Sequence, residues 1–164
     1  MITHLNVIAN VCQIQTFEKP AREKLGIKTQ TGLGLLPLGH IYGLTLVAHA
    51  AQYRGDSVII LPRFELATFL SAVQRFRIEL LSVVPPILIQ MLRNGEKCNE
   101  YDLSSVRYVN SGAAPLGKEV MDDMAKAYPQ WKIAQAYGTS FLSSPSYSFL
   151  LVYFMSMFLI FKRC

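Results

Sequence analysis

The sequence predicts an α/β fold whose mainly parallel sheet is flanked by helices. Short apolar runs alternate with longer segments whose apolar residues recur at helical spacing, and the connections between them are short. Of the 164 residues, 51% are hydrophobic, which is enough for one buried core. The net charge is +5, but the basic residues are scattered and form no block longer than Lys162-Arg163, so no nucleic-acid partner is expected.

The first elements follow from capping and spacing. Thr3 can cap a helix whose apolar residues fall on one face, namely Leu5, Ile8, Ala9 and Cys12. An apolar run at 33–36 leads into a turn, and residues 41–53 are predicted to be helical. The β-branched run 57–61 has the pattern of a strand buried on both faces.

The rest of the chain repeats the alternation of strand and helix. The predicted helices carry apolar residues at helical spacing: 66–76, 87–92 and 116–128. The predicted strands are short apolar runs: 80–84, 106–109 and 132–135. Pro85 and Pro86 end the first of these strands, and Asn94-Gly95 indicates a polar loop.

Three motifs follow predicted strands, where ligands bind in parallel sheets. The motif LPLGHIYGL, at 36–44, contains His40, whose imidazole can orient a carboxylate by hydrogen bonding. The motif SGAAPLGKE, at 111–119, is typical of a glycine turn that brings small residues and a proline to the start of a helix. The motif QAYG occupies 135–138. Each alone has an ordinary structural explanation, but together they indicate a site.

Together the motifs resemble the adenylate-forming acyl-CoA synthetase superfamily, most closely the 4-coumarate–CoA ligase-like enzymes. The resemblance implies a partial AMP-binding domain at 1–138, part of the large amino-terminal domain, followed by an unrelated apolar tail at 139–164. The implied reaction is ATP-dependent adenylation of a carboxylic acid, either hydroxycinnamate-like or a fatty acid, and then transfer of the acyl group to CoA. Mg²⁺ is implied as a cofactor beside ATP and CoA.

The resemblance also assigns roles to residues. The catalytic candidates are His40, beside the reacting carboxylate, and Ser140. The substrate-binding candidates line the acyl side of the site: His40, Tyr42, Ser111, Gly112 and Ala113. The nucleotide-binding candidates come from the two later motifs: Ser111, Gly112, Ala113, Ala114, Pro115, Gln135, Ala136, Tyr137, Gly138, Thr139 and Ser140. No metal ligand is assigned, because Phe141 stands where relatives carry the glutamate that supports magnesium.

Departures from the family pattern bear on activity and on substrate. Gly39 replaces a phenylalanine common in relatives, which removes an aromatic wall beside His40. No phosphate loop precedes the first motif, and the family's ribose aspartate, hinge and carboxy-terminal domain have no counterpart. We therefore expect this chain to lack adenylation activity on its own.

The apolar tail leaves other functions open. The segment 147–161 is almost wholly apolar, but 15 helical residues span only about 22 Å of a ~30 Å hydrocarbon core. The alternative is a non-catalytic, membrane-associated protein anchored through 141–161, and a further possibility is a truncated or mis-joined gene product. Three cysteines at no metal or redox spacing, with no secretory signal, predict a cytoplasmic protein, with membrane association as the alternative.

Overall fold

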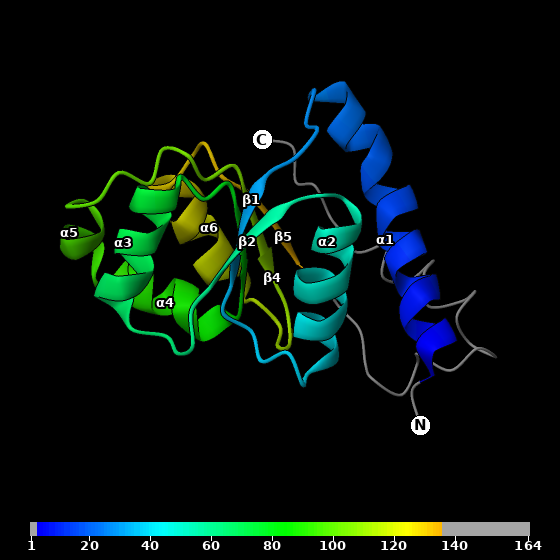
Figure 1. Ribbon diagram of the computed structural model, residues 1–164. Coiled ribbons are helices and arrows are strands. Elements are labelled where there is room, and N and C mark those ends of the chain that lie inside the picture. Colours follow the sequence, from blue (N-terminus) through cyan, green and yellow to red (C-terminus); the bar gives the residue numbers. More distant parts are fainter. Residues whose placement is uncertain (1–2, 136–164) are drawn as a thin grey trace.

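Five parallel strands form a single sheet in the computed structural model, which describes residues 3–135 (Figure 1). The sheet order is β2-β1-β3-β4-β5. The strands are β1 (Thr31–Gly34), β2 (Ser57–Ile60), β3 (Leu80–Val83), β4 (Tyr108–Ser111) and β5 (Lys132–Gln135). Because all neighbouring strands run parallel, their carboxyl ends lie along one edge, and this confirms the predicted parallel sheet.

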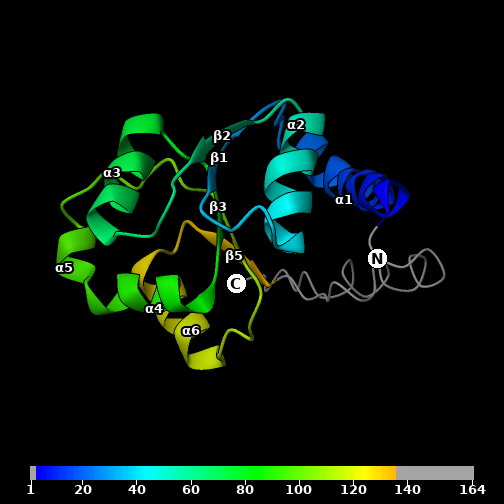
Figure 2. The same cartoon turned by 60° about the horizontal axis from the view of Figure 1, so that its bottom comes forward.

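Helices cover the sheet on both faces (Figures 1 and 2). One face carries α3 (Leu66–Phe76), α4 (Pro85–Arg93), α5 (Gly95–Cys98) and α6 (Lys118–Ala127). The other face carries a π-helix, η1 (Gly43–Ala50), continued by α2 (Ala51–Tyr53). The long amino-terminal helix α1 (His4–Lys24) packs against η1 from outside.

The main core lies between the sheet and the helices α3, α4 and α6. Its centre consists of side chains with no exposed surface: Phe69, Leu70, Val73, Leu81, Val83, Leu88, Met91, Val109 and Met124. Capping residues and prolines in the sequence determine where the helices that carry these core side chains begin. Glu65 caps α3 by accepting hydrogen bonds from the amides of Ala67 and Thr68, and Pro85 and Pro86 begin α4 without losing a backbone hydrogen bond.

On the opposite face, a glycine lets η1 approach the sheet closely. A Cβ atom at Gly34 of β1 would lie 2.6 Å from Ile60 Cδ1 and 2.9 Å from Val47 Cγ1. The absence of a side chain therefore sets the spacing between β1 and η1. Ile60 comes from the neighbouring strand and Val47 from η1, so all three elements meet there.

A buried ionic cluster joins α1 to the turn before β2. Asp56 accepts from Arg22 at 2.8 Å, from Arg54 at 2.7 Å and from the Gln30 amide at 3.1 Å. Glu18 of α1 lies 2.9 Å from Arg54. Burial raises the pKa of the Glu18 carboxyl, although Arg54 and Arg22 oppose that shift.

Several predicted elements are confirmed, and Thr3 caps α1 as expected. Strand β4 lies two residues beyond its predicted range, because its ladder pairs Leu80–Val83 with Tyr108–Ser111. The predicted helix at 41–53 is mostly a π-helix. The predicted loop at Asn94-Gly95 is wrong, since a short helix, α5, begins at Gly95.

One prediction about burial is wrong as well. The run 57–61 was expected to be buried on both faces, but β2 is an edge strand and its Ile60 is 56% exposed. On the predicted apolar face of α1, Leu5 is 64% and Ile8 58% exposed. The side chains of α1 that are buried are Asn6 and Val11.

The membrane alternative depends on residues beyond this description. From residue 3 to residue 135, the helices are too short or too polar to cross a bilayer. The segment 141–161, like the whole tail 139–164, lies outside the described residues.

Candidate functional site

The candidate site lies at the carboxyl edge of the sheet. Residues 35–42 follow β1, the loop 112–117 follows β4, and Gln135 ends β5. Strand β3 separates β1 from β4 in the sheet, so the first two segments flank the end of β3. A hydrogen bond from the hydroxyl of Tyr42 to the backbone oxygen of Asn110, 3.0 Å long, ties them together.

His40 lies in a tight turn that leads into the helix of the first motif. Its amide donates to the Pro37 carbonyl at 3.0 Å, and its own carbonyl accepts from the Leu44 amide at 2.9 Å. The imidazole is exposed, and its Nδ1 accepts a hydrogen bond from the Tyr42 amide at 3.1 Å. The ring therefore caps the first turn of the helix and keeps Nε2 available to a ligand.

Tyr42 connects the helix to the sheet. It is only 8% exposed, and its hydroxyl is occupied by the bond to Asn110. Burial raises the pKa of the Tyr42 phenol well above its usual range, with an opposing contribution from a hydrogen bond to Ser82. The contact with substrate assigned to Tyr42 from the resemblance stays a prediction. In the structure, the Tyr42 hydroxyl joins the segment after β1 to β4.

The loop after β4 presents small residues to solvent. Ser111 is 1% exposed, and its Oγ has no hydrogen-bond partner. The Gly112 amide donates to the Val83 carbonyl at 3.2 Å, which fixes the start of the loop against β3. Ala113 then adopts a φ of 67°, in the left-handed region, and Ala113, Ala114 and Pro115 are exposed.

Gln135 clamps this loop from the neighbouring strand. Its Nε2 donates to the Leu116 carbonyl at 3.2 Å and to Met121 Sδ at 3.0 Å, while its Oε1 accepts from the Leu116 amide at 3.4 Å. Gln135 is also the register partner of Ser111 across β4 and β5. The second and third motifs are therefore physically joined, as their predicted positions after adjacent strands require.

The remaining candidates of the third motif cannot be placed. Ala136, Tyr137, Gly138, Thr139 and Ser140 lie outside the described residues, so their assigned contacts stay predictions. Sequence reasoning missed two contributors that the structure supplies. The backbone oxygens of Asn110 and Leu116 accept the hydrogen bonds that join the motifs. Because these contacts do not involve the side chains, the identities of the two residues could not predict them.

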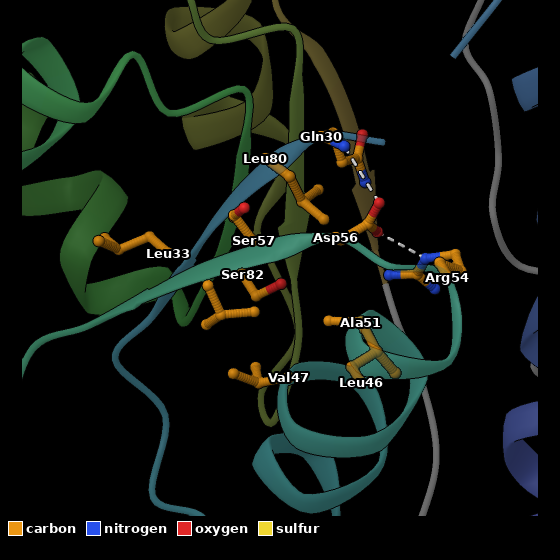
Figure 3. A pocket seen from close by; sticks show the side chains of 12 residues that line it. Gln30, Leu33, Leu46, Val47, Ala51, Arg54, Asp56, Ser57, Leu80 and Ser82 are labelled. Carbon is orange, nitrogen blue, oxygen red and sulfur yellow. Dashed lines mark hydrogen bonds and ion pairs between the residues drawn. The ribbon is translucent and has the colours of Figure 1, made fainter. Parts of the chain in front are cut away.

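A cavity of about 20 Å³ lies away from this edge, beneath η1 (Figure 3). Its wall is formed by side chains of the sheet and of the helix above it, among them Leu33, Val47, Ala51, Leu80 and Ser82. This volume suits about one water molecule. The cavity is therefore a packing gap and not the space for a carboxylic acid or a nucleotide.

The fold and these motifs agree with the comparisons. The family model described as AMP-binding enzyme matches residues 1–146. The chain belongs to the AMP-binding enzyme family. Among curated members, the acyl-CoA ligase easD of Emericella nidulans is 42% identical over 84% of this chain, and 4-coumarate–CoA ligase 3 of Arabidopsis thaliana is 39% identical over 84%. The resemblance stated from the motifs is thereby confirmed.

Two solved structures are similar to this chain over part of their length. The N-terminal domain of FACL13 from Mycobacterium tuberculosis superposes with a TM-score of 0.61 at 27% identity, over 70% of this chain and 28% of that one. The o-succinylbenzoate coenzyme A synthetase of Bacillus subtilis gives a TM-score of 0.66 at 23% identity, over 87% and 27%, and so shows the fold alone. The chain spans about a quarter of the length of the curated relatives, 24% of each of the two named above.

Proposed function

We propose that this chain contributes part of the amino-terminal domain of an acyl- or aryl-CoA ligase. The proposed reaction joins a carboxylic acid to AMP from ATP, releases pyrophosphate, and then passes the acyl group to the thiol of CoA. The observation that carries the proposal is the pair of ties at the carboxyl edge of the sheet. Tyr42 binds the His40 segment to β4, and Gln135 binds the loop after β4 to β5.

These hydrogen bonds leave two surfaces free to contact ligands, the imidazole of His40 and the loop after β4. The exposed imidazole of His40 offers a hydrogen bond to a carboxylate, the group that reacts in adenylation. The segment 113–115 is exposed and carries small side chains, against which a flat base can lie closely. Ser111 adds a buried hydroxyl with no hydrogen-bond partner at the foot of this loop.

The described residues fit the implied cofactors unevenly. The loop suits the adenosine part of ATP, and we assign Ser111 to Pro115 and Gln135 to that contact. The Bacillus subtilis synthetase was solved in complex with ATP and magnesium ion. Within 3–135 of this chain, however, no three His, Cys, Asp or Glu side chains gather as a metal site would require. The described residues therefore do not form a Mg²⁺ site by themselves, and CoA has the role of the acyl acceptor alone.

The substrate class rests on the first motif. Gly39 leaves open space beside His40, since a Cβ atom built there would meet nothing within 4 Å. We propose a carboxylic acid with a bulky or flexible acyl group, hydroxycinnamate-like or fatty, as the ligand. A cytoplasmic location stays a prediction from the cysteines, of which Cys12 is exposed and free and Cys98 buried and free.

The proposal is tested by ligand titration of the chain, with amide resonances as the readout. AMP is expected to shift the resonances of Gly112, Ala113 and Leu116, and an acid such as 4-coumarate to shift those around His40. Ala113→Glu should abolish the AMP response, because it places a carboxylate and its bulk on the contact surface. The reverse change, Glu119→Ala on the exposed start of α6, serves as a control and should leave the response intact. Shifts that are absent or spread evenly over the chain would contradict the proposal.

A second assay separates binding from turnover. We expect acid-dependent pyrophosphate release by this chain to equal the blank without protein. Phe141 offers no oxygen to a cation, and adenylation depends on charge stabilisers around the phosphorus. Turnover above the blank with any hydroxycinnamate or medium-chain acid would show that the chain is catalytic by itself.

A further inference from the structure

We propose that Gly43 is a positioning residue for His40, and that the turn which it permits holds His40 as the neutral tautomer with its proton on Nε2. The ligand that this nitrogen meets rests on the proposed function, but the tautomer and its dependence on Gly43 do not. Two hydrogen bonds and one close approach of backbone atoms support this role.

The first hydrogen bond determines the tautomer. The amide of Tyr42 donates to Nδ1 of His40 at 3.1 Å, so Nδ1 carries a lone pair and not a proton. In the neutral ring the proton is then on Nε2. An exposed Nε2–H is a donor, which is the polarity that a carboxylate oxygen accepts.

The second hydrogen bond closes the turn. The amide of His40 donates to the Pro37 carbonyl at 3.0 Å, and this bond sets where the imidazole begins. The Pro37 carbonyl lies directly against Gly43. A Cβ atom at Gly43 would be 2.3 Å from the Pro37 oxygen, 2.9 Å from the Pro37 carbon and 3.1 Å from the Leu36 oxygen.

Those neighbours are backbone atoms, so a side chain at position 43 cannot be relieved by rotating a neighbouring side chain. The carbonyl itself must move, and it is the acceptor that closes the His40 turn. Once the turn opens, Nδ1 loses its alignment with the Tyr42 amide. The ring is then free to exchange between its two neutral tautomers.

A second histidine, His49, provides an internal reference for the tautomer of His40. Nδ1 of His49, in the helix η1 that follows the His40 turn, donates to the carbonyl of Leu44 at 2.7 Å, so a neutral His49 carries its proton on Nδ1. The structure thus assigns opposite tautomers to two histidines that are nine positions apart in the sequence. One spectrum can report both.

The experiment is a two-dimensional ¹H–¹⁵N correlation of the imidazole rings in the full 164-residue chain at a mildly alkaline pH. His40→Gln and His49→Gln assign the signals. We expect the Nε2–H pattern for His40 and the Nδ1–H pattern for His49. An Nδ1–H pattern for His40 in the unchanged chain overturns the proposal, whether or not any acid or nucleotide binds.

Gly43→Ala tests the positioning role. We expect it to convert the single His40 pattern into an exchange average of both tautomers, while His49 keeps its pattern. Gly34→Ala is the matched control, because a Cβ atom there is also crowded, but by the ends of the Ile60, Val47 and Val58 side chains, away from the turn. It should leave the His40 pattern of the folded chain unchanged.

Pro37→Gly keeps the test decisive if Gly43→Ala does not fold. It loosens the same carbonyl at an exposed position without crowding it, so the His40 pattern should again become an average. An unchanged Nε2–H pattern in a folded Gly43→Ala chain, or in Pro37→Gly, overturns the role of this turn. Failure of AMP and 4-coumarate to shift any resonance would instead count against the proposed function, and the tautomer result would stand.

Discussion

The backbone of the loop after β4 is strained at Ala113. Its φ of 67° lies in the left-handed region, where a Cβ atom costs about 1–2 kcal/mol. The loop is nevertheless held in place, because Gly112 donates to Val83 at one end and Gln135 clamps Leu116 at the other. Strain of this kind persists where surrounding contacts over-determine the backbone, and such positions cluster at ligand sites.

Relieving that strain should stabilise the fold. We expect Ala113→Gly to raise the free energy of unfolding by about 0.5–1 kcal/mol, the relieved strain less the extra chain entropy of glycine. Ala114→Gly is the control, since Ala114 has no positive φ, and it should lower stability by a similar amount. Urea unfolding measures both changes. If both substitutions destabilise equally, Ala113 is not strained in solution.

The buried phenol of Tyr42 makes stability sensitive to alkali. Its pKa is raised in the folded chain, so its contribution is complete below the ordinary tyrosine pKa of about 10 and is lost as pH rises above it. We expect Tyr42→Phe to cost about 1 kcal/mol at neutral pH through the lost bond to Asn110, and to flatten the alkaline decline. Thermal melts from neutral to alkaline pH test this. A variant that declines as steeply as the parent would refute the assignment.

Among the elements, α1 is anchored by ion pairs and by the buried Val11, while Leu5 and Ile8 of its apolar face do not contribute. The helix contributes Glu18 and Arg22 to the cluster around Asp56, and it turns Leu5 and Ile8 outward. The side chains of Arg54 and Asp56 are 4% and 2% exposed. Buried charges of this kind are costly to separate, because removing one partner leaves the others desolvated and unpaired.

Asp56→Asn should therefore be strongly destabilising. The change removes the negative charge that faces Arg22 and Arg54, and we expect a loss of about 3–5 kcal/mol. Glu23→Gln is the matched control, since the Lys19–Glu23 pair is exposed at 3.9 Å and should contribute less than about 0.5 kcal/mol. Urea unfolding of the two variants gives the comparison. Equal effects would show that the cluster is solvated in solution.

Among the described residues of the molecule, several large apolar side chains are exposed to solvent. Leu5 and Ile8 lie exposed along α1, and Ile60 lies on the edge strand β2. An edge strand offers unpaired backbone groups to another chain, and exposed apolar side chains favour association.

We expect the chain to self-associate with increasing concentration, and Leu5→Lys combined with Ile8→Lys to reduce that association at unchanged helix content. Tyr53→Lys, which removes a similarly exposed side chain from α2, is the control and should have a smaller effect. Sedimentation over a concentration series distinguishes the variants. A monomeric parent chain at all concentrations would rule out this role for the α1 surface.

Sequence alone determined the type and order of most elements and the position of the candidate site. Helical spacing and β-branched runs are local properties, so the alternation of strand and helix, and the cap at Thr3, could be predicted from neighbouring residues. The motifs at His40, Ser111 and Gln135 were placed correctly at strand ends for the same reason.

Burial of the surfaces, and the hydrogen bonds that already occupy groups of the site, depend on how distant segments pack together. The run 57–61 is apolar, but nothing local states that β2 ends at the edge of the sheet, and that order determines its exposure. Likewise the bond from Tyr42 to Asn110 spans 68 positions and the clamp of Gln135 on Leu116 spans 19. Both use backbone atoms, which every residue shares, so no sequence pattern marks them, and they exist only once strand order brings the segments together.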